Sequence, residues 1–141
     1  MSATAQTGYF FMPEHIILVG ASERPHSLGE RIFSHLLGSS YQGKITPVNL
    51  RHSSVAGIPS YSSLSKIPGQ ADLVVAVIPP DHYDSLFRAC RKKDLRHIIL
   101  IQDWENLPPE SCKNARSIIQ KYHGDDLPIT VCNSAGGPLP S

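Results

Sequence analysis

The stretch Asp72-Leu-Val-Val-Ala-Val-Ile78 holds six apolar residues in a row and ends at Pro79-Pro80. A continuous apolar run of this length predicts a strand covered on both faces, as in the middle of a parallel sheet. Similar runs at His15–Val19 and His97–Ile101 predict two further strands. Strands are also predicted at 44–49, at 128–132 and, very short, at 55–58. Pro47 lacks an N–H, so it is expected where the sheet needs no hydrogen-bond donor.

Amphipathic segments separate these strands. Ser27 is predicted to cap a helix, with Glu30 completing a capping box and Gly38 ending it. Asp81 is expected to cap a second helix, and Pro108-Pro109 starts a third that ends at Gly124. The alternation predicts an α/β, Rossmann-like fold: about five strands in a mostly parallel sheet, with helices on both faces.

Composition narrows the function classes. The 141 residues carry a net charge of +1, which favours neither nucleic acid nor a membrane surface as partner. Five cations between 88 and 96 are interpreted as a solvated helix end. Three widely spaced cysteines and seven histidines without ligand spacing favour neither a disulfide framework nor a metal site, and the expected location is the cytoplasm. Cys90 falls on the apolar face of its helix and is predicted to be core.

The chain is expected to form one domain. Residues 1–13 are interpreted as an N-terminal arm, residues 14–136 as the α/β domain and residues 137–141 as a C-terminal tail. Parallel sheets bind ligands beyond the carboxyl ends of their strands. The function is therefore sought in the loops at 20–27, 49–54, 78–81 and 101–105.

The first of these loops can hold phosphate. In Gly20-Ala-Ser-Glu-Arg-Pro-His-Ser-Leu-Gly29, Ser22 occupies the place of the second glycine of a dinucleotide fingerprint. A hydroxyl together with backbone N–H groups at a helix start can bind a phosphate. The alternative is that Ser22 only caps the turn locally.

The second loop is cationic. NAD enzymes place a carboxylate after the second strand, whereas Asn49-Leu-Arg-His-Ser-Ser54 contains no acid. Arg51 and His52 can instead bind a phosphate on a ribose. This favours coenzyme A, with its 3′-phosphate, or NADP; the alternative for Arg51 is a solvated loop cation.

Three motifs together resemble the CoA-binding domain that opens NDP-forming acyl-CoA synthetases and related protein lysine acetyltransferases. They are Val19-Gly-Ala-Ser-x-x-Pro-x-Ser-x-Gly29, Pro47-Val-Asn-x-x-His52 with Gly57, and Ala71 to Pro80. The chain is also similar to the N-terminal domain of the succinyl-CoA synthetase α subunit. The resemblance covers about residues 14–136.

The resemblance implies a role for each matching position. Gly20, Ser22 and Pro25 would hold the CoA diphosphate with the helix start, Arg51 stands at the family's lysine, and Ile78-Pro79-Pro80 matches the pantetheine segment. No catalytic or metal-binding residue is predicted. The predicted cofactor-binding residues are Gly20, Ala21, Ser22, Pro25, Ser27, Asn49, Arg51, His52, Ile78, Pro79, Pro80 and Gln102.

The sequence thus predicts non-covalent binding of coenzyme A or an acyl-CoA, by a stand-alone module or by the N-terminal domain of a synthetase or acetyltransferase. Other domains or subunits would be its partners and would supply catalysis. Two alternatives stay open. One is an NADP-binding oxidoreductase domain. The other is a degenerate regulatory or interaction module, motivated by the bulky Trp104 and by the absence of the family's Gly-Pro before Asn133.

Overall fold

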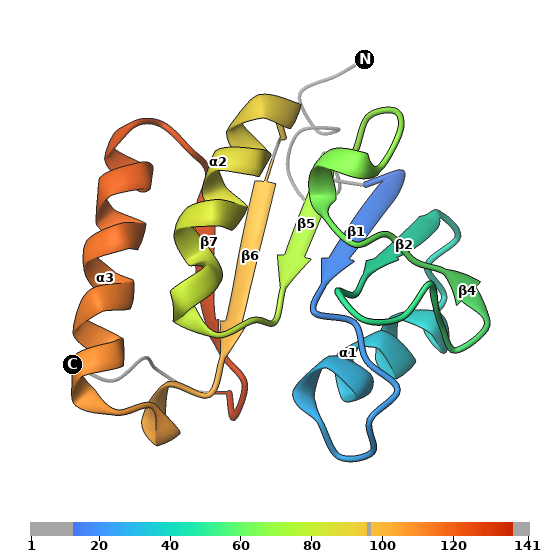
Figure 1. Cartoon of the computed structure of the whole chain (residues 1–141), viewed down its shortest axis with the longest axis horizontal. Coiled ribbons are helices and arrows are strands. Elements are labelled where there is room, and N and C mark those ends of the chain that lie inside the picture. The colour runs from blue at the N-terminus through green and yellow to red at the C-terminus, as the bar shows by residue number, and fades with distance from the viewer. Residues whose placement is uncertain (1–12, 96, 137–141) are drawn as a thin grey trace, which may run out of the picture.

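Five parallel strands form one sheet in the order β2-β1-β5-β6-β7 (Figure 1). The computed structural model describes residues 13–95 and 97–136, so the predicted tail and all of the predicted arm except Pro13 lie outside the described residues. The elements are β1 (His15–Val19), α1 (Leu28–Leu37), β2 (Lys44–Val48), β3 (Ser54–Val55), β4 (Ile58–Pro59), η2 (Leu64–Lys66), β5 (Leu73–Ala76), η3 (Pro80–His82), α2 (Tyr83–Lys93), β6 (His97–Gln102), η4 (Trp104–Asn106), α3 (Pro109–Gly124) and β7 (Ile129–Asn133).

The predicted central strand lies in the middle of the sheet. β5 pairs with β1 on one side and β6 on the other, and all four of its residues are buried. The prediction of a Rossmann-like α/β fold with a parallel sheet is confirmed.

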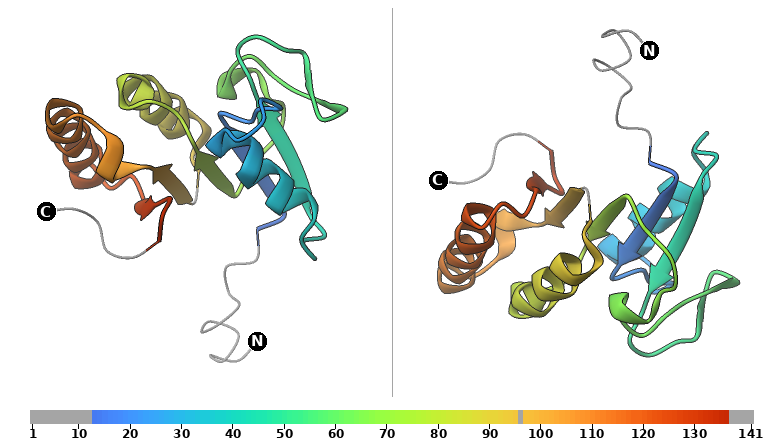
Figure 2. Two further views of the ribbon diagram at one scale, coloured as in Figure 1. Left: turned by 90° about the horizontal axis from the view of Figure 1, so that it is seen from below. Right: turned by 90° about the horizontal axis from the view of Figure 1, so that it is seen from above.

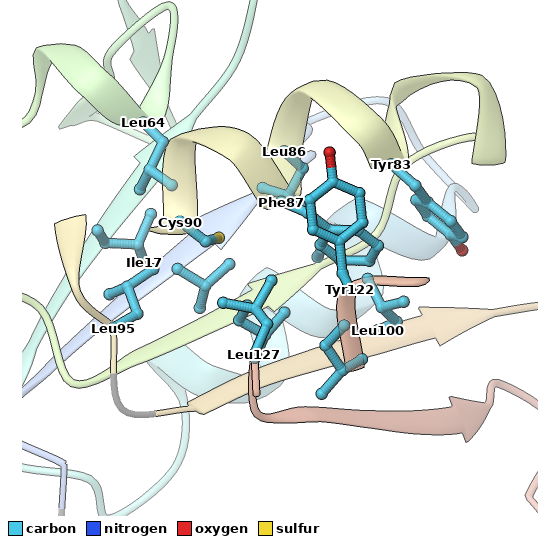
Figure 3. Close-up of a cluster of buried hydrophobic side chains, with 14 of the residues drawn as sticks. Ile17, Leu64, Tyr83, Leu86, Phe87, Cys90, Leu95, Leu100, Tyr122 and Leu127 are labelled. Atoms are coloured by element: carbon cyan, nitrogen blue, oxygen red, sulfur yellow. The ribbon is translucent and has the colours of Figure 1, made fainter. Parts of the chain in front are cut away.

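Helices cover both faces of the sheet, as Figure 2 shows. On one face α1 places Phe33 against Ile16, Leu18 and Val75. On the other face α2 and α3 cover a larger core, in which Tyr83, Phe87 and Tyr122 pack over side chains of the sheet (Figure 3). Cys90 lies in this core with no exposed surface, as predicted, and burial raises the pKa of its thiol to about 12.

The connection from β2 to β5 differs from the expectation of one short strand. It holds an antiparallel pair, β3 with β4, joined by Ala56 and Gly57 at φ 51° and 79°. Two consecutive left-handed residues make the tight turn that a two-residue hairpin needs. Of the two, only Gly57 is a residue type that predicts such a turn from the sequence.

The helix starts are only partly as predicted. Ser27 caps α1 by accepting a hydrogen bond from Glu30 N at 3.2 Å. The capping box is not reciprocal, because the Glu30 carboxylate accepts from Ser34 Oγ instead. The prediction that Asp81 caps the second helix is wrong: Pro80 begins a 3₁₀ turn that includes Asp81, and α2 starts at Tyr83.

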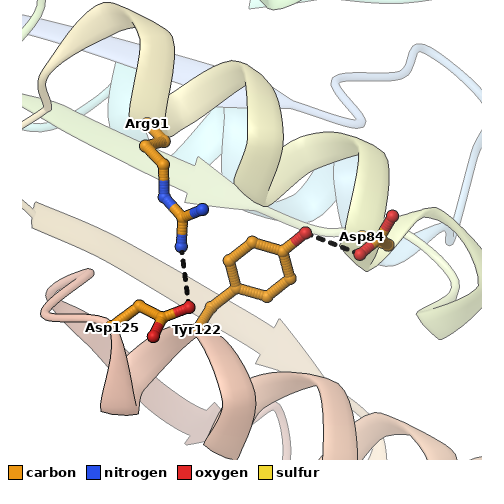
Figure 4. A network of polar contacts seen from close by, with 4 residues as sticks. All are labelled: Asp84, Arg91, Tyr122 and Asp125. Atoms are coloured by element: carbon orange, nitrogen blue, oxygen red, sulfur yellow. Dashed lines mark hydrogen bonds and ion pairs between the residues drawn. The ribbon is translucent and has the colours of Figure 1, made fainter.

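Polar side chains tie α2 to α3. Tyr122 Oη donates to Asp84 Oδ1 at 2.6 Å, and Arg91 Nη2 donates to Asp125 Oδ2 at 3.3 Å (Figure 4). Lys93 Nζ donates to the carbonyl oxygens of Ile67 and Gly69. Several cations of the basic segment therefore serve contacts within the domain. In the part of the chain described here, no helix is both long and apolar enough to cross a bilayer.

Candidate functional site

Three adjoining cavities open where β1, β2 and β5 end. The deep cavity, about 450 Å³, lies between the β1, β2 and β5 ends and α2. The helix cavity, about 310 Å³, lies against the start of α1, and the rim cavity, about 500 Å³, lies between the first two loops. Ser22 and Arg24 line all three, so we treat the cavities as one crevice. This is the position at which open parallel sheets bind ligands.

Two glycines let the backbone close in at the head of this crevice. Gly20 has φ +97°, and a Cβ there would lie 2.2 Å from the carbonyl oxygen of Val77. A Cβ on Gly29 would lie 2.1 Å from the carbonyl oxygen of Gly20. Because neither side chain exists, β1, the end of β5 and the first turn of α1 come into direct backbone contact, which brings the helix N-terminus to the crevice.

The turn after β1 is held by its serines. Ser22 Oγ accepts from Arg24 N at 2.9 Å, so Ser22 does cap the turn locally; whether it also binds a phosphate stays a prediction. Ser27 Oγ donates to the Arg24 carbonyl at 2.7 Å, and Ser27 N reaches the same oxygen at 3.2 Å. His26 completes the turn at φ 67°. Local capping leaves Ser22 on the crevice wall, where its hydroxyl proton can still be donated to a ligand.

Asn49 organises the second loop. Its Nδ2 donates to the Ala21 carbonyl at 2.8 Å, which ties the two loops together. Its Oδ1 accepts from the backbone N–H groups of Arg51 at 2.8 Å and His52 at 2.9 Å. The carboxamide thus acts within the protein and sets the path of the cationic segment.

The rim cavity carries most of the charge. Arg24, Arg51 and His52 line it with one acid, Glu23, and all four residues are exposed. Arg51 also lines the deep cavity. Three cationic or titratable basic side chains around one opening suit a ligand with several negative charges.

The far wall of the crevice follows the end of β5. Ile78 and Pro79 line the deep and helix cavities, and Pro80 lines the helix cavity. Gln102 lies there too, and its Nε2 donates to the Ile78 carbonyl at 3.0 Å and to Tyr83 Oη at 3.2 Å. Burial raises the pKa of the Tyr83 phenol, so its hydroxyl stays neutral. Gln102 therefore fixes this wall from behind.

The structure brings the predicted residues together, with one exception. All of the predicted cofactor-binding residues line the crevice except Pro25, which lines none of the three cavities. Trp104, which motivated the alternative of a degenerate module, lines none of the three cavities. The residue is 6% exposed and packs in the α2–α3 core, with Nε1 donating to the Cys132 carbonyl at 3.1 Å.

Sequence reasoning missed part of the lining. Arg24 stands inside the turn that was singled out, and its charge was the signal available. The floor of the deep cavity gave no sequence signal, because it joins the η2 segment to one side of α2; it is formed by Ser62, Ser63, Leu64, His82, Ser85, Leu86 and Ala89.

Comparisons with known proteins agree with this geometry. The family model described as "CoA binding domain" matches residues 14–134. The chain is 37% identical over 130 residues to the ADP-forming acetate–CoA ligase II subunit alpha of Pyrococcus furiosus. The aligned region covers 91% of this chain and 28% of that protein. The chain thus spans only about a quarter of the length of this relative.

Solved structures give the same assignment at the level of the fold. The crystal structure of PH0766 from Pyrococcus horikoshii OT3 superposes with a TM-score of 0.72 at 27% identity, over 87% of this chain and 28% of that one. A dinucleotide-forming acetyl-coenzyme A synthetase 1 of Ca. Korarchaeum cryptofilum superposes with a TM-score of 0.70 over 91% of this chain and 26% of that one. At 21% identity it shows the shared fold alone. The chain therefore belongs to the CoA binding domain family and is related to the α subunit of ADP-forming acyl-CoA synthetases.

Proposed function

We propose that the crevice binds coenzyme A or an acyl-CoA without forming a covalent bond to it. The observation that carries the proposal is the convergence of the first turn, the cationic second loop and the Ile78–Pro80 wall on one opening. Membership of the CoA binding domain family supports the same ligand.

The diphosphate of the ligand would lie at the start of α1. Backbone N–H groups of the first helical turn and the positive end of the helix dipole favour a negative charge there. Ser22 lines the same helix cavity and can donate its hydroxyl proton to a phosphate oxygen, whereas the Ser27 hydroxyl is engaged with the Arg24 carbonyl and holds the turn. The pantetheine arm would then pass over Ile78, Pro79 and Pro80, whose apolar surfaces suit its chain.

The phosphorylated ribose would lie at the rim. Arg51 and His52 project from a loop that Asn49 holds in place, and a guanidinium can form two parallel hydrogen bonds with a phosphate. Coenzyme A carries this phosphate on the 3′-oxygen.

The module would work with other domains or subunits of an acyl-CoA synthetase. The curated relatives with the strongest matches are several times longer than the chain, and two of them are named as subunits. Catalysis would come from those other parts, and the residues around the crevice would bind and orient the ligand.

Calorimetry with coenzyme A and dephospho-CoA tests the role of Arg51. A charge-assisted contact contributes roughly 1.5–3 kcal/mol, so Arg51→Ala should weaken coenzyme A binding about ten- to a hundred-fold. The same change should leave dephospho-CoA binding unaltered. Arg31→Ala removes an exposed arginine from α1, outside the crevice, and serves as the matched control. Equal affinities for both ligands in all three proteins would contradict the assignment.

An NADP-binding domain is the second candidate, because the acid-free, cationic loop would equally suit a 2′-phosphate. Ser22 in place of the fingerprint glycine argues against it. Fluorescence titration with NADPH separates the two: tight NADPH binding without coenzyme A binding would reverse the order. A flat thermal-shift response to both ligands would instead favour a module that has lost its ligand.

A further inference from the structure

We propose that Arg24 binds the diphosphate of the ligand, so that the crevice uses two arginines for two different phosphate groups. The inference rests on the proposed function, in which Arg51 faces the ribose phosphate. It assigns a role to a residue that neither the sequence motifs nor the family resemblance singled out.

The position of Arg24 separates it from Arg51. Arg51 lines the deep and rim cavities, whereas Arg24 also lines the helix cavity. Among the described residues that line the helix cavity, Arg24 is the one charged residue. A diphosphate at the start of α1 would therefore lie within reach of a single arginine and at the positive end of the helix dipole.

The backbone of Arg24 is fixed on both sides. Its N–H donates to Ser22 Oγ at 2.9 Å, and its carbonyl accepts from both Ser27 Oγ and Ser27 N. These contacts leave the side chain without a role in holding the turn. They also preorganise the point from which the guanidinium leaves the chain, which reduces the ordering that binding requires.

The neighbouring charges support the same division. Glu23 lines the rim cavity with Arg51 and His52 but is absent from the helix cavity. Its carboxylate therefore offsets part of the positive charge at the rim. Arg24 lines the rim cavity beside Glu23 as well, but none of the described residues that line the helix cavity is acidic.

Calorimetry on the same two ligands tests the proposal. Coenzyme A and dephospho-CoA share the diphosphate and differ only in the 3′-phosphate. Arg24→Ala should weaken both ligands by the same factor, about ten- to a hundred-fold. Arg51→Ala should weaken coenzyme A alone, and Arg31→Ala should change neither. Arg24→Lys keeps the charge but loses the planar fork, so its affinities should fall between wild type and Arg24→Ala.

The outcomes are separable. If the wild-type chain binds neither ligand, the proposed function fails and the role of Arg24 fails with it. If the wild-type chain binds and Arg24→Ala behaves like Arg31→Ala, the role of Arg24 alone is wrong. A loss confined to coenzyme A would place Arg24 on the ribose phosphate and would also overturn the proposal. Thermal unfolding should show Arg24→Ala as stable as wild type. Should Arg24→Ala not fold, Arg24→Gln, which keeps the three side-chain carbons and removes the charge, gives the same comparison.

Discussion

At the scale of single residues, Asn49 has an influence that its modest size hides. One carboxamide connects the first loop to the second, through the Ala21 carbonyl on one side and two N–H groups on the other. The Ser60 hydroxyl donates to the His52 carbonyl and holds the same segment from its other end. The cationic loop is thus positioned by neutral side chains, and the side chains of Arg51 and His52 are left for a ligand.

Replacing Asn49 with alanine should therefore reproduce the loss of affinity that is expected on removing Arg51. Asn49→Ala should weaken coenzyme A binding, because Arg51 is no longer held in position. The double variant with Arg51→Ala should be no weaker than either single variant, since residues that act through one contact are not additive. Calorimetry of the three proteins measures this. Full additivity would show that Asn49 contacts the ligand independently of Arg51.

Sequence reasoning reached the residues of the crevice but not the way they work. Motif positions predicted that Asn49, Gln102 and Ser27 belong to the site, and all three line it. Their hydrogen bonds are made to other atoms of the protein. A sequence motif does not show whether a polar side chain will bond to the protein or to a ligand. Pro25 was included because it stands in the motif, yet it lines none of the three cavities.

At the scale of elements, α1 is positioned by a missing side chain. The first turn of this helix rests on the strand β1 through Gly29, whose Cα faces the carbonyl of Gly20. Because the two backbones are in contact, the end of β1 determines where the N-terminus of α1 lies.

Gly29→Ala should reverse the usual effect of alanine in a helix. Alanine normally stabilises a helix by about 1 kcal/mol relative to glycine, but here its Cβ would overlap a backbone oxygen. We expect a loss of about 1–3 kcal/mol in the free energy of unfolding, the range for forcing a methyl group into a packed site. Gly124→Ala is the matched control, because that glycine ends α3 and a Cβ there meets nothing within 4 Å. Urea unfolding measures both, and equal effects would contradict the prediction.

The elements themselves could be predicted because their signals are local. Apolar runs locate β1, β5 and β6, and the spacing of apolar residues locates α1 and α2. The β3–β4 hairpin and the 3₁₀ start before α2 could not be predicted in the same way. Each depends on a few backbone angles, such as the left-handed Ala56, which the sequence does not favour.

At the scale of the whole molecule, stability should depend on pH through the link between α2 and α3. The hydrogen bond from Tyr122 lowers the pKa of Asp84, burial partly opposes this, and the charges of Arg88 and Lys121 add to the lowering. A carboxyl whose folded-state pKa is below its unfolded value of about 3.9 stabilises the fold at neutral pH. That contribution is lost as the pH falls from about 5 through the folded-state pKa.

Tyr122→Phe should reduce the loss of unfolding free energy that accompanies a fall in pH below about 5. Without the hydroxyl, the pKa of Asp84 rises towards its ordinary value, so less stability remains to be lost on acidification. Tyr41→Phe is the control, because its hydroxyl donates to the Pro13 carbonyl rather than to a carboxylate. The unfolding free energy of Tyr41→Phe should fall with decreasing pH as it does in the wild type. Chemical unfolding at a series of pH values measures all three proteins, and parallel profiles would show that the Tyr122 hydroxyl does not couple the protonation of Asp84 to folding.

The proline in β2 has a consequence for the behaviour of the protein in concentrated solution. β2 is the outermost strand on its side of the sheet, and Tyr61 N donates to the outward-facing carbonyl of Pro47. Pro47 itself has no N–H to donate to an added strand. A strand of another molecule therefore cannot form a continuous hydrogen-bond ladder along β2, which disfavours edge-to-edge aggregation there.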